Sequence, residues 1–178
     1  MSRTGPNHFF LARHGVTIVN LLRERGANEN EALLPAGREQ ARMLAGRVGE
    51  LGIERIWTSP LHRAREVAEI VAQACDLPLE VASGLREIDV REKVAGAPDS
   101  ETGPDETFEA ALERVGSTLE QLRRGNGAFL GVTHMGTIRA ARILLCGGPR
   151  EGFEDFTVEH CQLIRFQQNG ELWEVHAE

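Results

Sequence analysis

Arg13 and His14 stand next to each other directly after the apolar run Phe9–Ala12, and Gly15 follows them at once. A guanidinium group binds the oxygens of an anion with its planar fork, and a neutral imidazole offers a ring nitrogen as a nucleophile. Gly15 lets the backbone turn or lets another group approach it closely. These residue types at this spacing predict a site where a histidine attacks an anionic substrate.

Two later segments repeat the pattern of an apolar run that ends in a polar group. Residues 56–59 precede Arg63, and residues 129–133 precede His134. If all three apolar runs are parallel strands, their polar groups meet beyond the carboxyl ends of the strands. That edge of an open α/β sheet is where ligands bind. We therefore expect Arg63 and His134 to share one site with the first pair.

The elements that must position these groups alternate between strand and helix patterns. Short apolar runs predict strands, and apolar residues at helical spacing predict helices between them. The expected strands are 8–12, 53–58, 77–81 and 128–133, with a hairpin of 161–167 and 171–176 around Asn169 and Gly170. The expected helices are 35–51, 60–75, 136–145 and one to residue 124 that is capped by Asp105 or Thr107. This order predicts an α/β fold with a mostly parallel, partly mixed sheet.

Two segments carry no such pattern, and the chain length sets the number of domains. Residues 16–34 are expected to be irregular, and residues 84–105 resist assignment. Loops as long as the second are often binding loops. The 178 residues predict one domain, spanning 1–178, with a core large enough to need no disulfide or metal.

The charge balance narrows the classes of partner. A net charge of -7 argues against general binding to nucleic acid or to anionic membranes, both of which require a basic face. Lys93 is the one lysine among the 20 basic residues, so a phosphate site in this chain must use arginine.

The cysteines and the absence of long apolar runs indicate the cellular compartment in which the protein is expected. Cys75, Cys146 and Cys161 form no CxxC pair and no metal-ligand spacing, which indicates free thiols in a reducing compartment. The first seven residues lack the apolar region of a signal peptide, and no run approaches membrane-spanning length. We therefore expect a cytoplasmic protein.

Several motifs, in order along the chain, resemble those of the histidine phosphatase superfamily, which includes the cofactor-dependent phosphoglycerate mutases. The resemblance covers about residues 9–140. The first motifs are Leu11-Ala12-Arg13-His14-Gly15-Val16-Thr17 with Asn20, the helix start 34–41, and Ser59-Pro60-Leu61-His62-Arg63-Ala64. The later ones are Leu85-Arg86-Glu87-Ile88-Asp89, and Val132-Thr133-His134-Met135-Gly136 with Ile138-Arg139. It implies the three-layer sandwich of the phosphoglycerate mutase-like fold, with helices on both faces of the sheet. It also implies phosphoryl transfer through a phosphohistidine, without a metal.

The residues themselves fit that chemistry, because phosphoryl transfer is mostly positioning and charge stabilisation. Arg13 and Arg63 supply forks for the phosphoryl oxygens, and His14 supplies the nucleophilic nitrogen. His134 offers another donor, and either Asn20 or Thr17 could add a neutral one.

Glu87 is the expected general acid, which protonates the leaving alcohol and then activates water. After Glu87 the family usually continues with a glycine, an aromatic residue and an acidic-glycine pair, and this chain has residues 90–96 instead. Asp89 and Glu106 are therefore the alternatives for the acid. His160 precedes a strand, which favours a structural role, and the edge of the pocket is its alternative place.

These observations predict a metal-independent phosphatase that acts on a small phosphorylated metabolite or a phosphoprotein. The short chain, with modest insertions at 16–34 and 88–105, favours hydrolysis over a mutase, since the family's mutases resemble longer chains. A phosphoglycerate mutase, a protein phosphohistidine phosphatase and a non-catalytic module that binds a phosphorylated ligand stay open as alternatives. Oligomeric state and natural substrate are not encoded in any recognisable pattern.

Overall fold

The computed structural model describes residues 7–22, 30–88, 106–125, 127–149 and 152–178. Within these residues the strands are β1 His8–Arg13, β2 Ile53–Thr58, β3 Leu79–Val81, β4 Ala128–Thr133, β5 Leu163–Asn169 and β6 Leu172–Ala177. The helices are α1 Ile18–Leu22, α2 Pro35–Val48, α3 His62–Cys75, α4 Phe108–Arg123 and α5 Met135–Cys146, with a 3-10 turn, η1, at Ser83–Leu85. None of the helices in the described ranges has the length and apolar character needed to cross a bilayer.

The strands form one mixed sheet in the order β3-β2-β4-β1-β5-β6. The pairs β1–β4, β2–β4 and β2–β3 are parallel, and β5 is antiparallel to both β1 and β6. The register places Arg13 beside Thr133 and Thr58 beside Val132. The predicted parallel sheet with a terminal antiparallel hairpin is confirmed, and the three strands that carry the site motifs end at one edge.

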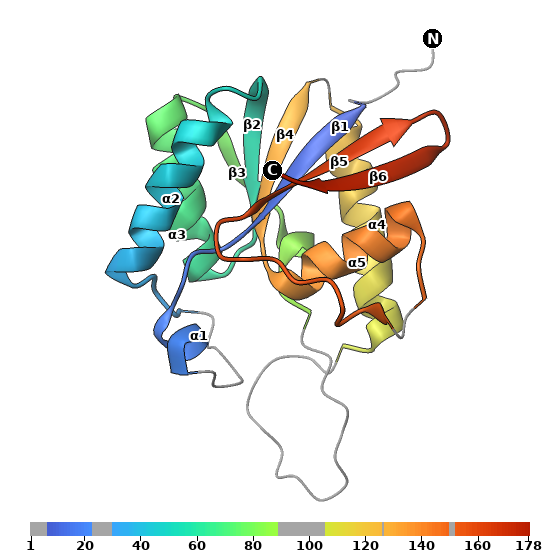
Figure 1. Cartoon of the computed structure of the whole chain (residues 1–178), viewed down its shortest axis with the longest axis horizontal. Helices are drawn as coiled ribbons and strands as arrows, with labels where there is room; N and C mark the ends of the chain where they lie inside the picture. The colour runs from blue at the N-terminus through green and yellow to red at the C-terminus, as the bar shows by residue number, and fades with distance from the viewer. Residues whose placement is uncertain (1–6, 23–29, 89–105, 126, 150–151) are drawn as a thin grey trace, which may run out of the picture.

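Helices cover both faces of this sheet, with α2 and α3 on one side and α4 and α5 on the other (Figure 1). Side chains that alternate along β1 point to opposite faces. Phe10 and Ala12 therefore pack in the core under α2 and α3, whereas Phe9 and Leu11 pack in the core under α4 and α5. The expected three-layer sandwich is confirmed, and burial on both faces explains why β1 and β4 read as unbroken apolar runs.

An aromatic stack fixes β1 between its two neighbours. The ring of Phe9 lies 5.0 Å from the ring of Phe129 on β4 and 5.0 Å from that of Phe166 on β5. All three side chains are fully buried, and each such burial stabilises the fold by roughly 1.5–3 kcal/mol. The stack holds the strand that delivers Arg13 and His14 to the sheet edge.

Helix α3 begins later than the sequence predicts. Pro60 lies before the helix instead of in its first turn, and Leu61 is the capping residue. The reason is the side chain of Ser59, whose hydroxyl oxygen accepts a hydrogen bond from the backbone N–H of Leu61 over 3.2 Å. Helix α2 likewise ends at Val48, three residues before the predicted end.

The segment expected to be irregular, 16–34, contains the short helix α1. A bridge pairs Thr17 with Leu33, and the Glu31 carboxylate accepts from the backbone N–H of Val19 over 3.0 Å, so both ends of the segment meet. A helix of five residues is too short for helical periodicity to be recognised.

The cap of α4 is Thr107, whose hydroxyl accepts from the N–H of Ala110 over 3.2 Å. The alternative cap, Asp105, and the alternative acid, Asp89, lie outside the described residues.

Candidate active site

His14 follows β1 directly, and the residue is 3% exposed. Its Nδ1–H donates to the carbonyl oxygen of Gly15 over 2.8 Å. Its Nε2 accepts from Nε of Arg63, 3.3 Å away. Because Nδ1 is the donor, the lone pair of the neutral ring is on Nε2. The backbone and Arg63 together therefore select the tautomer in which Nε2 can act as a nucleophile.

The surroundings of His14 also keep its ring neutral. Burial lowers the pKa of His14 well below its usual value, and the positive charge of Arg63 lowers it further. The hydrogen bond to Gly15 opposes this shift, and Arg13 adds to it. A neutral imidazole at physiological pH is the form that a nucleophilic histidine requires.

Gly15 allows the backbone of α2 to approach the turn that carries His14. A Cβ atom on Gly15 would lie 2.7 Å from the carbonyl oxygen of Gly37, and one on Gly37 would lie 2.5 Å from the carbonyl oxygen of Val16. Of the two roles expected for Gly15, close approach is the one that this packing requires. The first turn of α2 therefore packs directly against the turn that carries His14.

Arg13, at the end of β1, is held by the loop that precedes β5. Its Nη1 donates to the carbonyl oxygen of Val158 over 2.8 Å. Its buried Nε has no hydrogen-bond partner among the described residues. Arg139 on α5 anchors the same loop, because its guanidinium donates to the carbonyl oxygens of Phe156 and Glu154 over 2.7 and 2.8 Å.

Arg63 comes from the first turn of α3, which starts beyond the end of β2. The residue is 5% exposed, and its Nε reaches His14 across the carboxyl edge of the sheet. Burial lowers the pKa of Arg63 from its usual value, and the negative charges of Glu87 and Glu31 oppose that shift. The guanidinium stays charged, because the usual pKa of an arginine lies far above physiological pH.

His134 caps α5 directly after β4 and is fully buried. Its Nε2 lies 2.7 Å from the hydroxyl oxygen of Ser59, and its ring centre lies 5.2 Å from that of His14. Nδ1 of His134 has no hydrogen-bond partner among the described residues. Burial lowers the pKa of His134 well below its usual value, and the nearby His14 and Arg63 lower it further.

His160, expected to be structural or to lie at the edge of the pocket, contacts both the ring and the backbone of His14. Its ring centre is 5.6 Å from that of His14, and its Nδ1 lies 3.0 Å from the carbonyl oxygen of His14. The next residue, Cys161, adopts a positive φ of 56° and donates its N–H to the carbonyl oxygen of Arg13 over 3.0 Å. The two hydrogen bonds connect the turn before β5 to the turn that carries His14.

Glu87 projects from the segment that follows η1. Its Oε1 accepts from the N–H of Ile88 over 3.0 Å, and a Cβ atom on Gly136 would lie 2.6 Å from the same oxygen. Burial raises the pKa of the Glu87 carboxyl, whereas the Ile88 hydrogen bond and the positive charge of Arg63 lower it. The net shift is upward, in the direction that a general acid needs near neutral pH.

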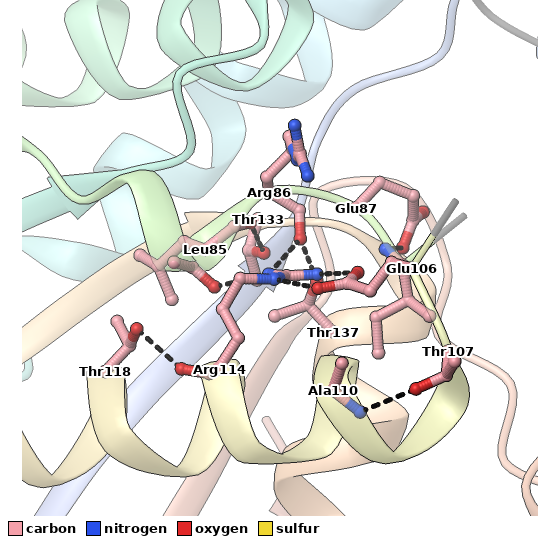
Figure 2. A network of polar contacts seen from close by, with 12 residues as sticks. Leu85, Arg86, Glu87, Glu106, Thr107, Ala110, Arg114, Thr118, Thr133 and Thr137 are labelled. Carbon is pink, nitrogen blue, oxygen red and sulfur yellow. Dashed lines mark hydrogen bonds and ion pairs between the residues drawn. The ribbon is translucent and has the colours of Figure 1, made fainter. Parts of the chain in front are cut away.

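Side chains from three elements hold the segment that carries Glu87 (Figure 2). Nη1 of Arg114 donates to the carbonyl oxygens of residues 84 and 86 over 2.7 and 3.0 Å. The Thr133 hydroxyl donates to the carbonyl oxygen of residue 85 over 2.6 Å. The Thr137 hydroxyl donates to that of residue 86 over 2.8 Å.

Glu106, the other alternative for the acid, is bound in an ion pair. Both of its carboxylate oxygens accept from Arg114, over 2.7 and 2.6 Å. These hydrogen bonds lower the pKa of Glu106. A carboxylate held in this form is poorly suited to donate a proton near neutral pH.

Thr17 and Asn20 bind each other at the start of α1. The Thr17 hydroxyl and N–H donate to Oδ1 of Asn20 over 2.8 and 3.2 Å. Thr17 is fully buried, and this contact uses its hydroxyl proton. Thr17 thus shapes the turn, and Asn20 has its amide group held in one orientation.

Ser59, Arg114 and Thr137 were not assigned a role from the sequence. Ser59 is the one with a signal, since it is the first polar residue after β2 in the motif that contains Arg63. No group of three or more His, Cys, Asp and Glu side chains in the described ranges is arranged to hold a metal ion.

Comparison with known proteins gives the family. Residues 9–177 match the model of the histidine phosphatase superfamily, branch 1. The chain is 28% identical to the probable phosphoglycerate mutase GpmB of Escherichia coli, over 92% of this chain and 86% of that protein.

Solved structures share the fold. A phosphoserine phosphatase variant from Entamoeba histolytica superposes with a TM-score of 0.77 at 20% identity, covering 94% of each chain. A mycobacterial glucosyl-3-phosphoglycerate phosphatase superposes with a TM-score of 0.77 at 19% identity, covering 97% of this chain and 98% of that one. With the family model matched from β1 to the end of β6, the chain belongs to the histidine phosphatase superfamily.

Proposed function

We propose that this protein is a phosphomonoester hydrolase that passes the phosphoryl group through His14. The observation that carries the proposal is the hydrogen-bond pattern of the His14 ring, with Nδ1 on the Gly15 carbonyl and Nε2 facing Arg63. A buried, neutral imidazole with its lone pair next to a guanidinium is arranged to attack a phosphorus atom whose oxygens the guanidinium binds.

The donors around His14 fit the charge of a phosphoryl group. Nε of Arg13 and Nδ1 of His134 are buried without a hydrogen-bond partner among the described residues. The ring centre of His134 lies 5.2 Å from that of His14, and Arg13 is the residue before His14. In the proposed scheme the Ser59 hydroxyl, 2.7 Å from Nε2 of His134, donates to that nitrogen, so that the ring proton is on Nδ1, where a phosphoryl oxygen can accept it. Asn20 would add its amide group as a neutral donor.

The reaction then has two halves. In the first, Nε2 of His14 forms a bond to phosphorus while the bond to the leaving oxygen breaks, and Glu87 gives its proton to that oxygen. In the second, the Glu87 carboxylate takes a proton from water, the water oxygen bonds to phosphorus, and the bond to His14 breaks. No metal ion is needed in this scheme, because the arginine charges offset the phosphoryl charge and the histidine N–H group adds a hydrogen bond to it.

The names of related proteins support small phosphorylated metabolites as substrates. Structural neighbours include phosphatases for phosphoserine and glucosyl-3-phosphoglycerate. The GpmB relative favours a second candidate, a phosphoglycerate mutase that returns the phosphoryl group from His14 to the sugar acid. Incubation with 3-phosphoglycerate separates the two, since hydrolysis releases inorganic phosphate and a mutase yields 2-phosphoglycerate.

The first test is hydrolysis of 4-nitrophenyl phosphate, with chelator present, by the native chain and by His14→Ala. We expect activity in the native chain only, and a quenched reaction should contain an acid-labile, base-stable phosphoryl group on His14. His62→Ala is the matched control, because His62 is an exposed histidine on α3. Full activity in His14→Ala would exclude His14 as the nucleophile.

A phosphohistidine protein phosphatase and a binding module give different results in the same series. The first would dephosphorylate a phosphohistidine protein faster than any small phosphate. The second would bind inorganic phosphate in a calorimetric titration without turning over any ester. Either result would replace the hydrolase proposal.

A further inference from the structure

Residues 86–88, the described part of the segment that carries Glu87, belong to no strand or helix. The three consecutive carbonyl groups at residues 84–86, in the last part of η1 and directly after it, accept hydrogen bonds from side chains of α4, β4 and α5. A backbone that is not paired with its neighbours takes its position from such contacts. The location of the Glu87 carboxyl therefore depends on side chains far away in the sequence.

Arg114 makes the largest number of these contacts. Its Nη1 donates to two carbonyl oxygens, and its Nε and Nη2 donate to the two carboxylate oxygens of Glu106 (Figure 2). The Arg114 and Glu106 side chains are 19% and 13% exposed, so water screens this ion pair less than a surface pair. The two-point contact with Glu106 fixes the plane of the guanidinium, and with it the direction of Nη1.

The other side of Glu87 leaves little room for movement. Gly136, at the start of α5, sits so close to Oε1 that a Cβ atom there would be 2.6 Å from it. Thr137, the next residue, binds the carbonyl oxygen of residue 86. The carboxyl is thus held between the first turn of α5 and the backbone segment that Arg114 supports.

We propose that Arg114, oriented by Glu106, is a positioning residue that places the Glu87 carboxyl for proton transfer to the leaving oxygen. This inference rests on the proposed hydrolase function. It adds that Arg114 and Glu106 control the step in which Glu87 protonates the leaving oxygen. Neither residue touches the phosphoryl group in this scheme. Their effect is confined to the geometry of the proton donor.

The acid step has a signature that general loss of structure does not share. A nitrophenol leaves as its anion without a proton near neutral pH, whereas phenol, with a pKa of about 10 as in tyrosine, needs the proton as the bond to phosphorus breaks. The constant kcat/KM reports the steps up to transfer onto His14, so it isolates the leaving-group protonation from the later attack of water. A displaced Glu87 should therefore affect phenyl phosphate far more than 4-nitrophenyl phosphate.

Arg114→Lys is the variant to test, because it keeps the positive charge and loses the planar fork. We expect kcat/KM to fall by about tenfold or more for phenyl phosphate and by about twofold or less for 4-nitrophenyl phosphate. Glu87→Gln should show the same selectivity with a larger loss. Arg124→Lys is the matched control, since Arg124 forms an exposed pair with Glu120 at the other end of α4 and should behave like the native chain.

The acid step should depend on Thr137 in the same way as on Arg114. Thr137→Val removes one donor to the carbonyl oxygen of residue 86, and Thr137→Ser keeps it. The selective loss on phenyl phosphate should appear in the valine variant and be absent in the serine variant. Equal losses on both esters in Arg114→Lys would overturn the proposal and leave Arg114 with a purely structural role.

A second measurement does not depend on turnover. Titration of the Glu87 carboxyl by carbon-13 NMR, with the signal identified from Glu87→Gln, should give a lower pKa in Arg114→Lys than in the native chain, because the displaced carboxyl becomes hydrated. An unchanged pKa would contradict the positioning role. If the native chain hydrolyses neither ester, the proposed function fails while this titration still decides whether Arg114 holds Glu87.

Discussion

Nε of Arg63 donates to Nε2 of His14 over 3.3 Å, so the charged group that would bind the phosphoryl oxygens also contacts the nitrogen that would attack phosphorus. The two residues are 49 positions apart and come from α3 and the end of β1. The contact selects the tautomer of His14, and the charge of Arg63 helps to keep the ring neutral.

Replacement of Arg63 should therefore change the pKa of His14 even without substrate. In Arg63→Gln the pKa of His14 should rise toward its usual value, since one of the causes that lower it is gone. Loss of a phosphoryl donor should also lower kcat/KM by roughly 10²–10³-fold. Nitrogen-15 NMR titration of the His14 ring measures the first effect. An unchanged His14 titration in Arg63→Gln would refute this electrostatic coupling.

Stability should fall as the pH drops below about 6.5. The pKa values of His14 and His134 are lower in the folded protein than in the unfolded chain, so the unfolded chain binds more protons in this range. Each such histidine contributes a slope of up to about 1.4 kcal/mol per pH unit. Glu87 has the opposite effect on the pH dependence of stability. Its pKa is raised on folding, so the folded protein binds its proton more tightly than the unfolded chain does.

Urea unfolding at several pH values between 7 and 5 measures this slope. In His14→Asn the slope should decrease by about the contribution of one histidine. A slope that is the same in the variant and in the native chain would mean that His14 has its usual pKa in the folded protein.

Gly15→Ala should destabilise the fold by about 1–3 kcal/mol, because its Cβ atom would meet the backbone carbonyl of Gly37, which cannot rotate away. Gly46→Ala is the matched control in α2, where a Cβ atom would meet nothing within 4 Å. That change should stabilise the protein by about 0.5–1 kcal/mol, since alanine favours a helix over glycine. Midpoints of urea unfolding compare the two variants.

Gly136→Ala should separate stability from activity. The new Cβ atom would lie 2.6 Å from Oε1 at the far end of the Glu87 side chain and 3.3 Å from Cβ of Ile88, so the Glu87 carboxyl must shift while the fold should be retained. The displaced carboxyl should lower kcat/KM for phenyl phosphate by about tenfold or more and spare 4-nitrophenyl phosphate. A variant with native activity on both esters would show that the place of Oε1 beside Gly136 is unimportant for catalysis.

Local patterns in the sequence were sufficient for much of the fold. The sequence predicts strands 53–58 and 128–133 with their actual bounds and β1 to within one residue, because buried strands read as short apolar runs. Helix α1 was missed because five residues hold too little periodicity, and the start of α3 was misplaced because the Ser59 side chain caps the preceding turn.

The sequence by itself determined which chemical groups meet: an arginine and a histidine at the end of one strand, and Arg63 and His134 after two others, at one edge of a parallel sheet. The tertiary structure decided how they meet. The contact of Arg63 with Nε2 of His14, the contact of His160 with the His14 backbone and the contact of Arg114 with the segment that carries Glu87 join residues 28 to 146 positions apart. No local pattern encodes such contacts, because their partners are brought together only by the packing of helices on the two faces of the sheet.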